Sequence, residues 1–347
     1  MTPSAQRRQH LLIFKIVDKL AEPCVPTQGQ GTPHDSRQKR PCPDGWSPWY
    51  PHAMRIPFAL AALILLPLSQ TAAQGQPATQ LTAAQVIARI QQAIPQKPPA
   101  DTVDTIKAGD PTTIVTGIVT CFTDSMDVLR QAVALHANLV ISHEPTFYNH
   151  RDENTLFIND PVYKEKLAYM QDHHLVVWRF HDQWHLRRPE PMTEAFTAAV
   201  GWQKYEHSDD PLFFTLPPTT VNQLAEDLQQ KLHARIVRVI GDPNLRVTGV
   251  AYRPGASGEA AQIKALQRDD VQVLVAGESS EWEAVMYTQD AEQQHRSKAL
   301  ILVGHSTSET DGMQTAATWL RTLFPGLPIE YVNSAEPYWL PDHPPPE

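Results

Sequence analysis

The sequence predicts an α/β fold, in which strands of parallel sheets alternate with covering helices along most of the 347-residue chain. Short runs of β-branched and apolar residues recur, separated by amphipathic segments of helical length, which is the pattern of α/β layers. Hydrophobic residues make up 41% of the chain, which is enough for a sizeable core. The segment "TTIVTGIVTCF" at 112–122, a helix opened by Asp124 or Ser125, and the strand "NLVIS" form a strand–helix–strand unit, which predicts a parallel pair.

The first half of this pattern predicts one α/β lobe at 82–205. Thr82 can cap a helix at 83–94, because the apolar residues that follow it recur at helical spacing. Beyond the strand–helix–strand unit, the sequence predicts helices at 161–174 and 191–200 and a strand at 175–180. The polar stretch "GWQKYEHSDDP" then marks the candidate boundary between lobes.

The second half repeats the scheme and predicts another α/β lobe at 206–335, followed by a tail at 336–347. Its expected helices are 220–234, 259–266, 281–294 and 310–324, and its expected strands are 235–241, 246–252, 271–277, 299–305 and 329–332. The alternation again favours parallel strands joined by helical crossovers.

A stretch near the N-terminus has the features of an export signal. Arg55 precedes an apolar run at 56–68, and Thr71-Ala72-Ala73 offers the small residues of a cleavage site. We therefore expect a cleaved signal peptide at 54–73, a linker at 74–81, and a periplasmic or extracellular protein; an uncleaved anchor is the alternative. Residues 1–53 are expected to be a non-native or disordered extension. The apolar run is shorter than the ~20 residues that span a bilayer, so no stable membrane insertion is expected.

Charge and cysteine content exclude two further classes of protein. The net charge of −9 argues against a nucleic-acid-binding protein, which would carry a basic face. Cys121 is the one cysteine after the predicted signal, so the exported chain is expected to be stabilised by its core and not by internal disulfides.

Imidazole and carboxylate side chains follow several of the predicted strands. Ligands of open α/β sheets bind beyond the carboxyl ends of the strands, where side chains from different strands converge. The side chains at these ends are His143 and Glu144, His181 to His185 in "HDQWH", Glu278 and Glu281, and His305 with Glu309.

The spacing in "GHSTSE" favours a metal site. If Ser306 or Thr307 opens a helix, His305 and Glu309 lie one turn apart and can face one point. Imidazole and carboxylate together suit Zn²⁺, Mn²⁺ or Fe²⁺. Two acidic and three imidazole groups exceed one tetrahedral shell, which predicts two divalent metal ions bridged by a carboxylate.

The segment "VTGIVTCFTDSMDVLRQAVALHANLVISHEPTFY" at 115–148 and the later "ALILVGHSTSE" resemble the two signature regions of the Nif-three-like dinuclear-metal-centre family. Its bacterial members are often named GTP cyclohydrolase 1 type 2-like. The resemblance covers about 82–335. It implies two α/β lobes enclosing a dinuclear metal site, assembly into a homohexamer, and cyclohydrolase-like chemistry.

The chain departs from the family pattern at two ligand positions. The family's His-His-Pro turn is His143-Glu144-Pro145 here, and its His-Thr-x-x-Asp turn ends in His185 where the family has Asp. The terminal Gly-His-x-x-x-Glu is intact as His305 and Glu309. One His became a carboxylate and one carboxylate became His, so the resemblance implies an unchanged total of three His and two Glu ligands. These are His143, Glu144, His185, His305 and Glu309, with Glu309 as the bridging carboxylate.

Other polar residues receive supporting roles in this interpretation. His181 or Asp182 could orient His185. Glu278 or Glu281 could act as general base, or each could be a solvated carboxylate at a helix N-terminus. Trp282 stands where the family has a His that could shuttle protons. The remaining histidines, His150, His173, His174 and His295, are expected on the surface, and the Gly-rich turn at 252–258 is a weak candidate for binding an anion.

We therefore expect a metal-dependent hydrolase that activates a bridging water on an unknown small-molecule substrate. The alternative is a non-catalytic metal-binding protein or an interaction scaffold, because the sequence shows no leaving-group acid. A purely structural α/β module is a third reading. A homo-oligomer is expected from the resemblance.

Overall fold

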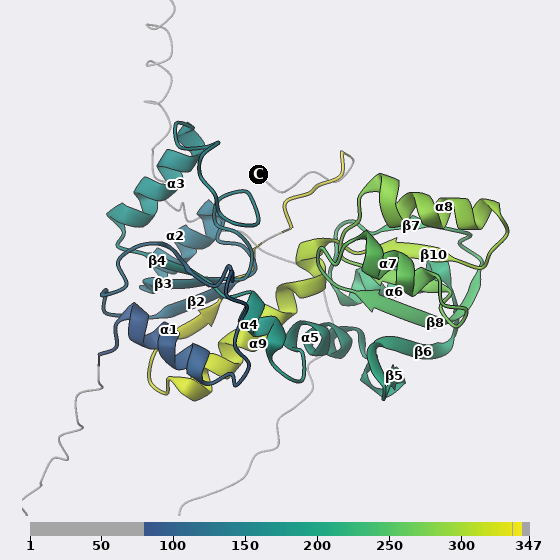
Figure 1. The fold of residues 1–347 in the computed structure, drawn as a ribbon, viewed down its shortest axis with the longest axis horizontal. Coiled ribbons are helices and arrows are strands. Elements are labelled where there is room, and N and C mark those ends of the chain that lie inside the picture. Colours follow the sequence, from purple (N-terminus) through teal and green to yellow (C-terminus); the bar gives the residue numbers. More distant parts are fainter. Residues whose placement is uncertain (1–79, 335, 342–347) are drawn as a thin grey trace, which may run out of the picture. The chain divides into compact units, whose positions relative to one another are not determined.

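The computed structural model describes residues 80–334 and 336–341 of the chain and confirms the predicted α/β class. The described residues form two sheets, one of five strands and one of six, each covered by helices on both faces (Figure 1). The segments predicted as an extension (1–53) and a signal peptide (54–73) lie outside the described residues, as does most of the linker (74–81). In the described part of the chain, no helix is long and apolar enough to cross a membrane.

The first sheet has the strand order β1-β4-β3-β2-β11. Its strands are β1 (Ile106–Ala108), β2 (Ile118–Cys121), β3 (Leu139–Ser142), β4 (Val176–Arg179) and β11 (Ile329–Tyr331). All neighbours pair in parallel except β1, which runs antiparallel to β4. Residues in β2, β3 and β4 are buried throughout, as expected of parallel strands covered on both faces.

Four helices cover the first sheet and account for its two hydrophobic layers. Helices α1 (Ala83–Gln92) and α9 (His305–Leu323) pack on the face that carries Leu139 and Ile141. Helices α2 (Met126–Ala134) and α3 (Pro161–Asp172) pack on the face that carries Val140. The alternation of neighbouring residues between these layers follows from the two-residue period of a strand.

The second sheet has the order β5-β6-β8-β9-β10-β7. Its strands are β5 (Glu206–His207), β6 (Asp210–Thr220), β7 (Arg238–Ile240), β8 (Arg246–Arg253), β9 (Val273–Ala276) and β10 (Ala299–Leu302). The central β8, β9 and β10 are parallel, and the outer pairs are antiparallel. One face is covered by α5 (Pro191–Val200) and α6 (Val221–Lys231), and the other by α7 (Glu259–Leu266), η2 (Glu281–Val285) and α8 (Met286–Gln293).

Several elements differ from those that the sequence pattern predicts. Strands β1, β5 and β6 and the short helices α4 (Asp182–Leu186) and η1 (Gln203–Tyr205) were not predicted. Strand β6 contains three prolines and has an irregular register between Thr215 and Thr219. Proline lacks the N–H group that a β-ladder needs, so a segment with several prolines is not predicted as a strand from its residue types. The helix expected at 281–294 begins instead with the π-helical η2, where Glu283 has non-helical dihedral angles.

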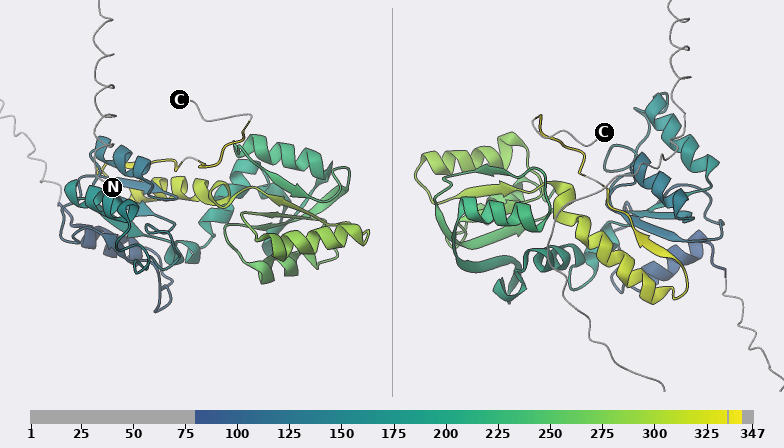
Figure 2. Two further views of the ribbon diagram at one scale, coloured as in Figure 1. Left: turned by 90° about the horizontal axis from the view of Figure 1, so that it is seen from above. Right: turned by 180° about the vertical axis from the view of Figure 1, so that it is seen from behind.

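The predicted lobe limits of 82–205 and 206–335 need one correction. Strand β11 belongs to the first sheet, where it pairs with β2, so the chain returns to its first lobe after completing the second. Helix α9 makes this return: it follows β10 of the second sheet and packs on the first sheet (Figure 2). Helices α5 and α9 contact each other closely, because Gly312 leaves room for Met192.

Candidate metal centre

Three strand ends bring the predicted ligands together. His143 and Glu144 directly follow β3, and their N–H groups continue the ladder by donating to the carbonyls of Cys121 and Phe122. His185 follows β4 on α4 (Asp182–Leu186), one turn after His181. The convergence predicted for strand ends therefore holds for these residues.

The third strand end supplies the remaining pair. Helix α9 begins at His305, immediately after Gly304, whose φ of +97° turns the chain out of β10. His305 Nε2 lies 3.1 Å from Glu309 Oε2, so the pair faces one point as the spacing predicts.

Distances between the side chains are short enough for shared cations. Glu144 Oε1 lies 3.5 Å from His305 Nε2 and 3.9 Å from His143 Nε2. His143 Nε2 lies 3.6 Å from Glu309 Oε2. Two sets of donor atoms each fall within 4.8 Å of one another, namely His143, His181 and His185, and His143, Glu144 and Glu309. These residues form a His/Glu cluster that could bind metal.

Nδ1 of each of the four imidazoles contacts an acceptor within the protein, by a hydrogen bond in three of them and by an ion pair in His305. His143 Nδ1 lies 3.2 Å from the carbonyl of Phe180, His181 Nδ1 lies 2.9 Å from Asp182, His185 Nδ1 lies 3.0 Å from Glu190, and His305 Nδ1 lies 3.4 Å from Glu278. Since an acceptor at Nδ1 fixes the proton there, Nε2 of His143, His181 and His185 is left to act as a ligand, whereas Nε2 of His305 is engaged by Glu309.

The imidazole of His143 is buried, with one nitrogen unsatisfied by the residues that the structure describes. The residue is fully buried, and within the described chain its Nε2 has no hydrogen-bond partner. Burial, together with the neighbouring imidazoles of His181 and His185, lowers the pKa of His143 well below its usual value, so the ring is neutral. A buried polar atom without a partner is unfavourable, and a cation at this point would satisfy it.

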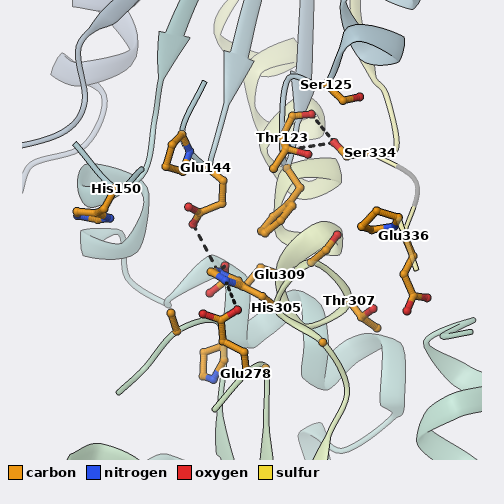
Figure 3. A pocket seen from close by; sticks show the side chains of 18 of the residues that line it. Thr123, Ser125, Glu144, His150, Glu278, His305, Thr307, Glu309, Ser334 and Glu336 are labelled. Atoms are coloured by element: carbon orange, nitrogen blue, oxygen red, sulfur yellow. Dashed lines mark hydrogen bonds and ion pairs between the residues drawn. The ribbon is translucent and has the colours of Figure 1, made fainter. Parts of the chain in front are cut away.

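Carboxylates surround His305 and determine its protonation (Figure 3). Burial alone would lower the pKa of this imidazole, but hydrogen bonds to Glu144, Glu278 and Glu309 raise the pKa of His305 to about 12. The same contacts also change the acidity of the carboxylates. Burial alone would raise the pKa of Glu144, but the hydrogen bond with His305 lowers it. Without a cation, the proton on Nε2 therefore neutralises the carboxylates. A divalent ion can replace it.

A buried carboxylate, which the sequence reading missed, holds the turn that presents His181. Asp104 accepts from the backbone N–H groups of His181, Asp182 and Gln183 at 2.8–2.9 Å, and burial raises its pKa. Asp182 in turn accepts from Thr102 Oγ1. The start of α4 is thus fixed by side chains distant in sequence, which spacing could not reveal.

The expected orienting roles are redistributed. Asp182 holds His181 and not His185, and His185 is held by Glu190, which also caps α5 through the N–H groups of Met192 and Thr193. His181 itself points into the cluster, with Nε2 3.7 Å from Glu144 Oε1. His181 is thus a potential ligand, and Glu190 is an orienting residue that the sequence reading did not identify.

The fully buried Arg179 holds Glu144 in place through an ion pair. Its Nε donates to the carbonyl of His143, and Nη2 lies 3.4 Å from Glu144 Oε2. A second buried carboxylate, Asp152, lies 3.7 Å from Nη1. The carboxylate that stands in place of the family's second His is therefore balanced by a buried cation.

The Gly-rich turn at 252–258 borders the cluster directly. Gly255 has a φ of +54°, and a Cβ there would lie 2.3 Å from Glu309 Oε1 and 3.0 Å from His305 Nε2. The backbone therefore approaches the ligands more closely than any other residue type would allow. Its structural role is to border the ligands.

The cluster opens into a cleft of about 1140 Å³. Glu278 and His150 line it; the ring of His150 lies 6.0 Å from that of His181, although its sequence suggested an ordinary surface position. Glu281 lies instead at a separate hollow beside Arg238, outside this lining, and Trp282 is 73% exposed. The structure thus brings Glu278 to the cluster but not Glu281.

Solved structures share this fold. The Staphylococcus aureus protein SA1388 is 17% identical, with a TM-score of 0.59 over 75% of this chain and 99% of that chain. A Bacillus cereus protein related to NIF3 is 13% identical, with a TM-score of 0.60 over 75% and 99%. The protein ybgI, described as of unknown function, is 21% identical, with a TM-score of 0.57 over 74% and 100%. No curated protein matches significantly. The family model described as Duf34/NIF3 (NGG1p interacting factor 3) matches residues 82–337, and the chain therefore belongs to this family.

Proposed function

We propose that the protein is a hydrolase that holds two divalent cations in the His/Glu cluster. The observation that carries this proposal is the shared orientation of three imidazoles, those of His143, His181 and His185, each with Nδ1 engaged and Nε2 left for a ligand. Donor atoms of Glu144 and Glu309 lie within 4.8 Å of His143 Nε2 and of one another, and His305 Nε2 contacts both carboxylates. This donor set fits borderline divalent ions.

Paired ions supply an activated water and polarise the bond that is cleaved. Other residues of the chain hold and orient the proposed metal ligands. Asp182 and Glu190 fix the rings of His181 and His185, and Arg179 fixes Glu144. The adjoining cleft has the volume of a small-molecule site, which favours an enzyme over a metal-storage protein.

Two cleft residues are suited to moving protons. Glu278 is half-exposed, and its hydrogen bond to His305 is the main cause that lowers its pKa, so the carboxylate is ionised and can accept a proton at neutral pH. His150 is exposed in the cleft, and its backbone carbonyl is anchored by Arg179. We assign proton acceptance to Glu278 and donation to the leaving group to His150.

Metal analysis is the first test. Purified full-length protein, stripped and then reconstituted with Zn²⁺ or Mn²⁺, should retain two ions per chain by elemental analysis. The Glu309→Gln variant should lose binding, whereas the matched Glu292→Gln variant, at an exposed site on α8, should not. Less than one ion per chain in the reconstituted native protein would refute the proposal.

Turnover separates an enzyme from a metal-binding scaffold. A panel of phosphoesters, amides and cyclic amidines should contain a substrate that the reconstituted protein cleaves and that Glu309→Gln does not. His150→Gln should lower kcat for that substrate about 10²- to 10⁴-fold without altering metal content. Metal binding without any turnover would favour the non-catalytic alternative.

Export and homohexamer assembly are proposals of the same kind. The apolar run at 56–68 with its small-residue site supports export, and the family resemblance supports a hexamer. Mass spectrometry of the protein from an expressing bacterium should find a new N-terminus after residue 73. Light scattering of that processed protein should give six times the mass of one chain.

A further inference from the structure

The donors of the cluster are unevenly distributed. One set of donors is the nitrogen-rich group, His143, His181 and His185, whose donor atoms fall within 4.8 Å of one another. The other is the carboxylate-rich group, Glu144, Glu309 and His305, linked by distances of 3.5 Å and 3.1 Å from His305 Nε2. His143 Nε2 lies between the two groups, 3.6 Å from Glu309 Oε2.

The nitrogen-rich group owes its character to two features. His185 is an imidazole held by Glu190, and His181 is turned into the cluster by Asp182, so both rings are oriented by carboxylates that do not themselves enter it. Their ring centroids are 4.9 Å apart. His143 adds an unpaired Nε2 that is fully buried. Three nitrogen donors whose rings are held by Asp182, Glu190 and the carbonyl of Phe180 form a preorganised site for a borderline ion.

The carboxylate-rich group has the opposite character. Glu144 and Glu309 each offer oxygen donors, and a third carboxylate, Glu278, lies behind His305 at 3.4 Å from Nδ1. Oxygen ligands suit harder ions such as Mn²⁺, whereas imidazole suits Zn²⁺.

We propose that the two metal positions are chemically unlike: the nitrogen-rich group, with His181 as a ligand, selects Zn²⁺, and the carboxylate-rich group accepts Mn²⁺. This inference rests on the proposed two-metal function and adds His181 to the ligands. It predicts that the native centre holds one ion of each kind when both are supplied.

The test uses the full-length, metal-free protein. One equivalent of Zn²⁺ is added first, followed by Mn²⁺ in 100-fold excess, and the free ions are removed by gel filtration. Elemental analysis should find one Zn and one Mn per chain, and electron paramagnetic resonance should show one bound Mn²⁺. A second experiment supplies two equivalents of Zn²⁺ together with the same excess of Mn²⁺. If the protein then holds two Zn and no Mn per chain, the inference survives only if the second Zn is displaced at least tenfold more readily than the first.

Variants assign each ion to its group. His181→Asp keeps a donor but replaces nitrogen with oxygen, and should lower the preference for Zn²⁺ over Mn²⁺ at the tight position about 10- to 100-fold. Glu144→Gln should lower Mn²⁺ retention and leave the first Zn²⁺ in place. Circular dichroism confirms that each variant is folded, and His181→Gln serves if His181→Asp is not.

The outcomes separate this inference from the proposed function. Native protein that binds no metal refutes both. Native protein that binds two ions with equal Zn²⁺ preference at both positions, or a folded His181 variant with unchanged preference, refutes the unlike positions but leaves the hydrolase proposal standing.

Discussion

Substituting Gly255 with Ala should separate the geometry of the ligands from the stability of the fold. The new Cβ would lie 2.3 Å from Glu309 Oε1, so the carboxylate must move roughly 0.7 Å to reach an acceptable contact. The contacted atom is the far end of a flexible side chain, so the clash costs the fold little. The φ of +54° adds about 1–2 kcal/mol, which lowers Tm by roughly 2–8 °C.

The displaced carboxylate should weaken Mn²⁺ binding at the carboxylate-rich group about 10- to 100-fold. Mn²⁺ affinity is measured by competition with a chromophoric chelator, and Tm by calorimetry of the metal-free protein. The matched control is Gly201→Ala, which has a φ of +73° and open space around the new Cβ. It should lower Tm by a similar amount and leave Mn²⁺ affinity unchanged. A folded Gly255→Ala protein that binds Mn²⁺ as tightly as the native chain would refute the reasoning.

Three further outcomes are expected. The affinity of the carboxylate-rich group for Mn²⁺ should rise about tenfold per pH unit between about pH 6 and 8, because binding must displace the proton of His305, whose raised pKa of about 12 keeps it bound throughout that range. Chelator competition at several pH values would contradict this if the slope were zero. Glu190→Ala should lower Zn²⁺ affinity about 10- to 100-fold, measured by titration calorimetry, because His185 is no longer held. The same change should lower the free energy of unfolding by about 1 kcal/mol, measured by urea denaturation, because helix α5 loses its cap. Gly312→Ala should lower the free energy of unfolding by about 1–3 kcal/mol, because the new Cβ would overlap Met192. An unchanged urea midpoint would show that the contact between α5 and α9 can accommodate a methyl group.

The sequence predicts the parts of the site that depend on local pattern. Buried parallel strands read as continuous apolar runs, and the residue after each run lies at the ligand-binding edge, so His143 and Glu144 could be located without coordinates. The i, i+4 spacing likewise predicts that His305 and Glu309 face one point, and they do.

What the sequence could not predict depends on contacts between distant segments. Asp104 lies 77 positions before His181, and nothing in either segment indicates that the carboxylate will hold that turn. Glu190 was hidden for a different reason: next to Pro191 it reads as an ordinary helix cap, and only the fold places its second contact on His185. Strand β6 was not predicted because its three prolines are unfavourable in a strand.

The late position of β11 has a consequence for how the molecule is made. During synthesis the edge of β2 has no partner until residues 329–331 emerge, long after the second sheet can form. An unpaired edge is a template for association with other chains. A chain stopped shortly before residue 329 should therefore aggregate, even though it contains every proposed metal ligand.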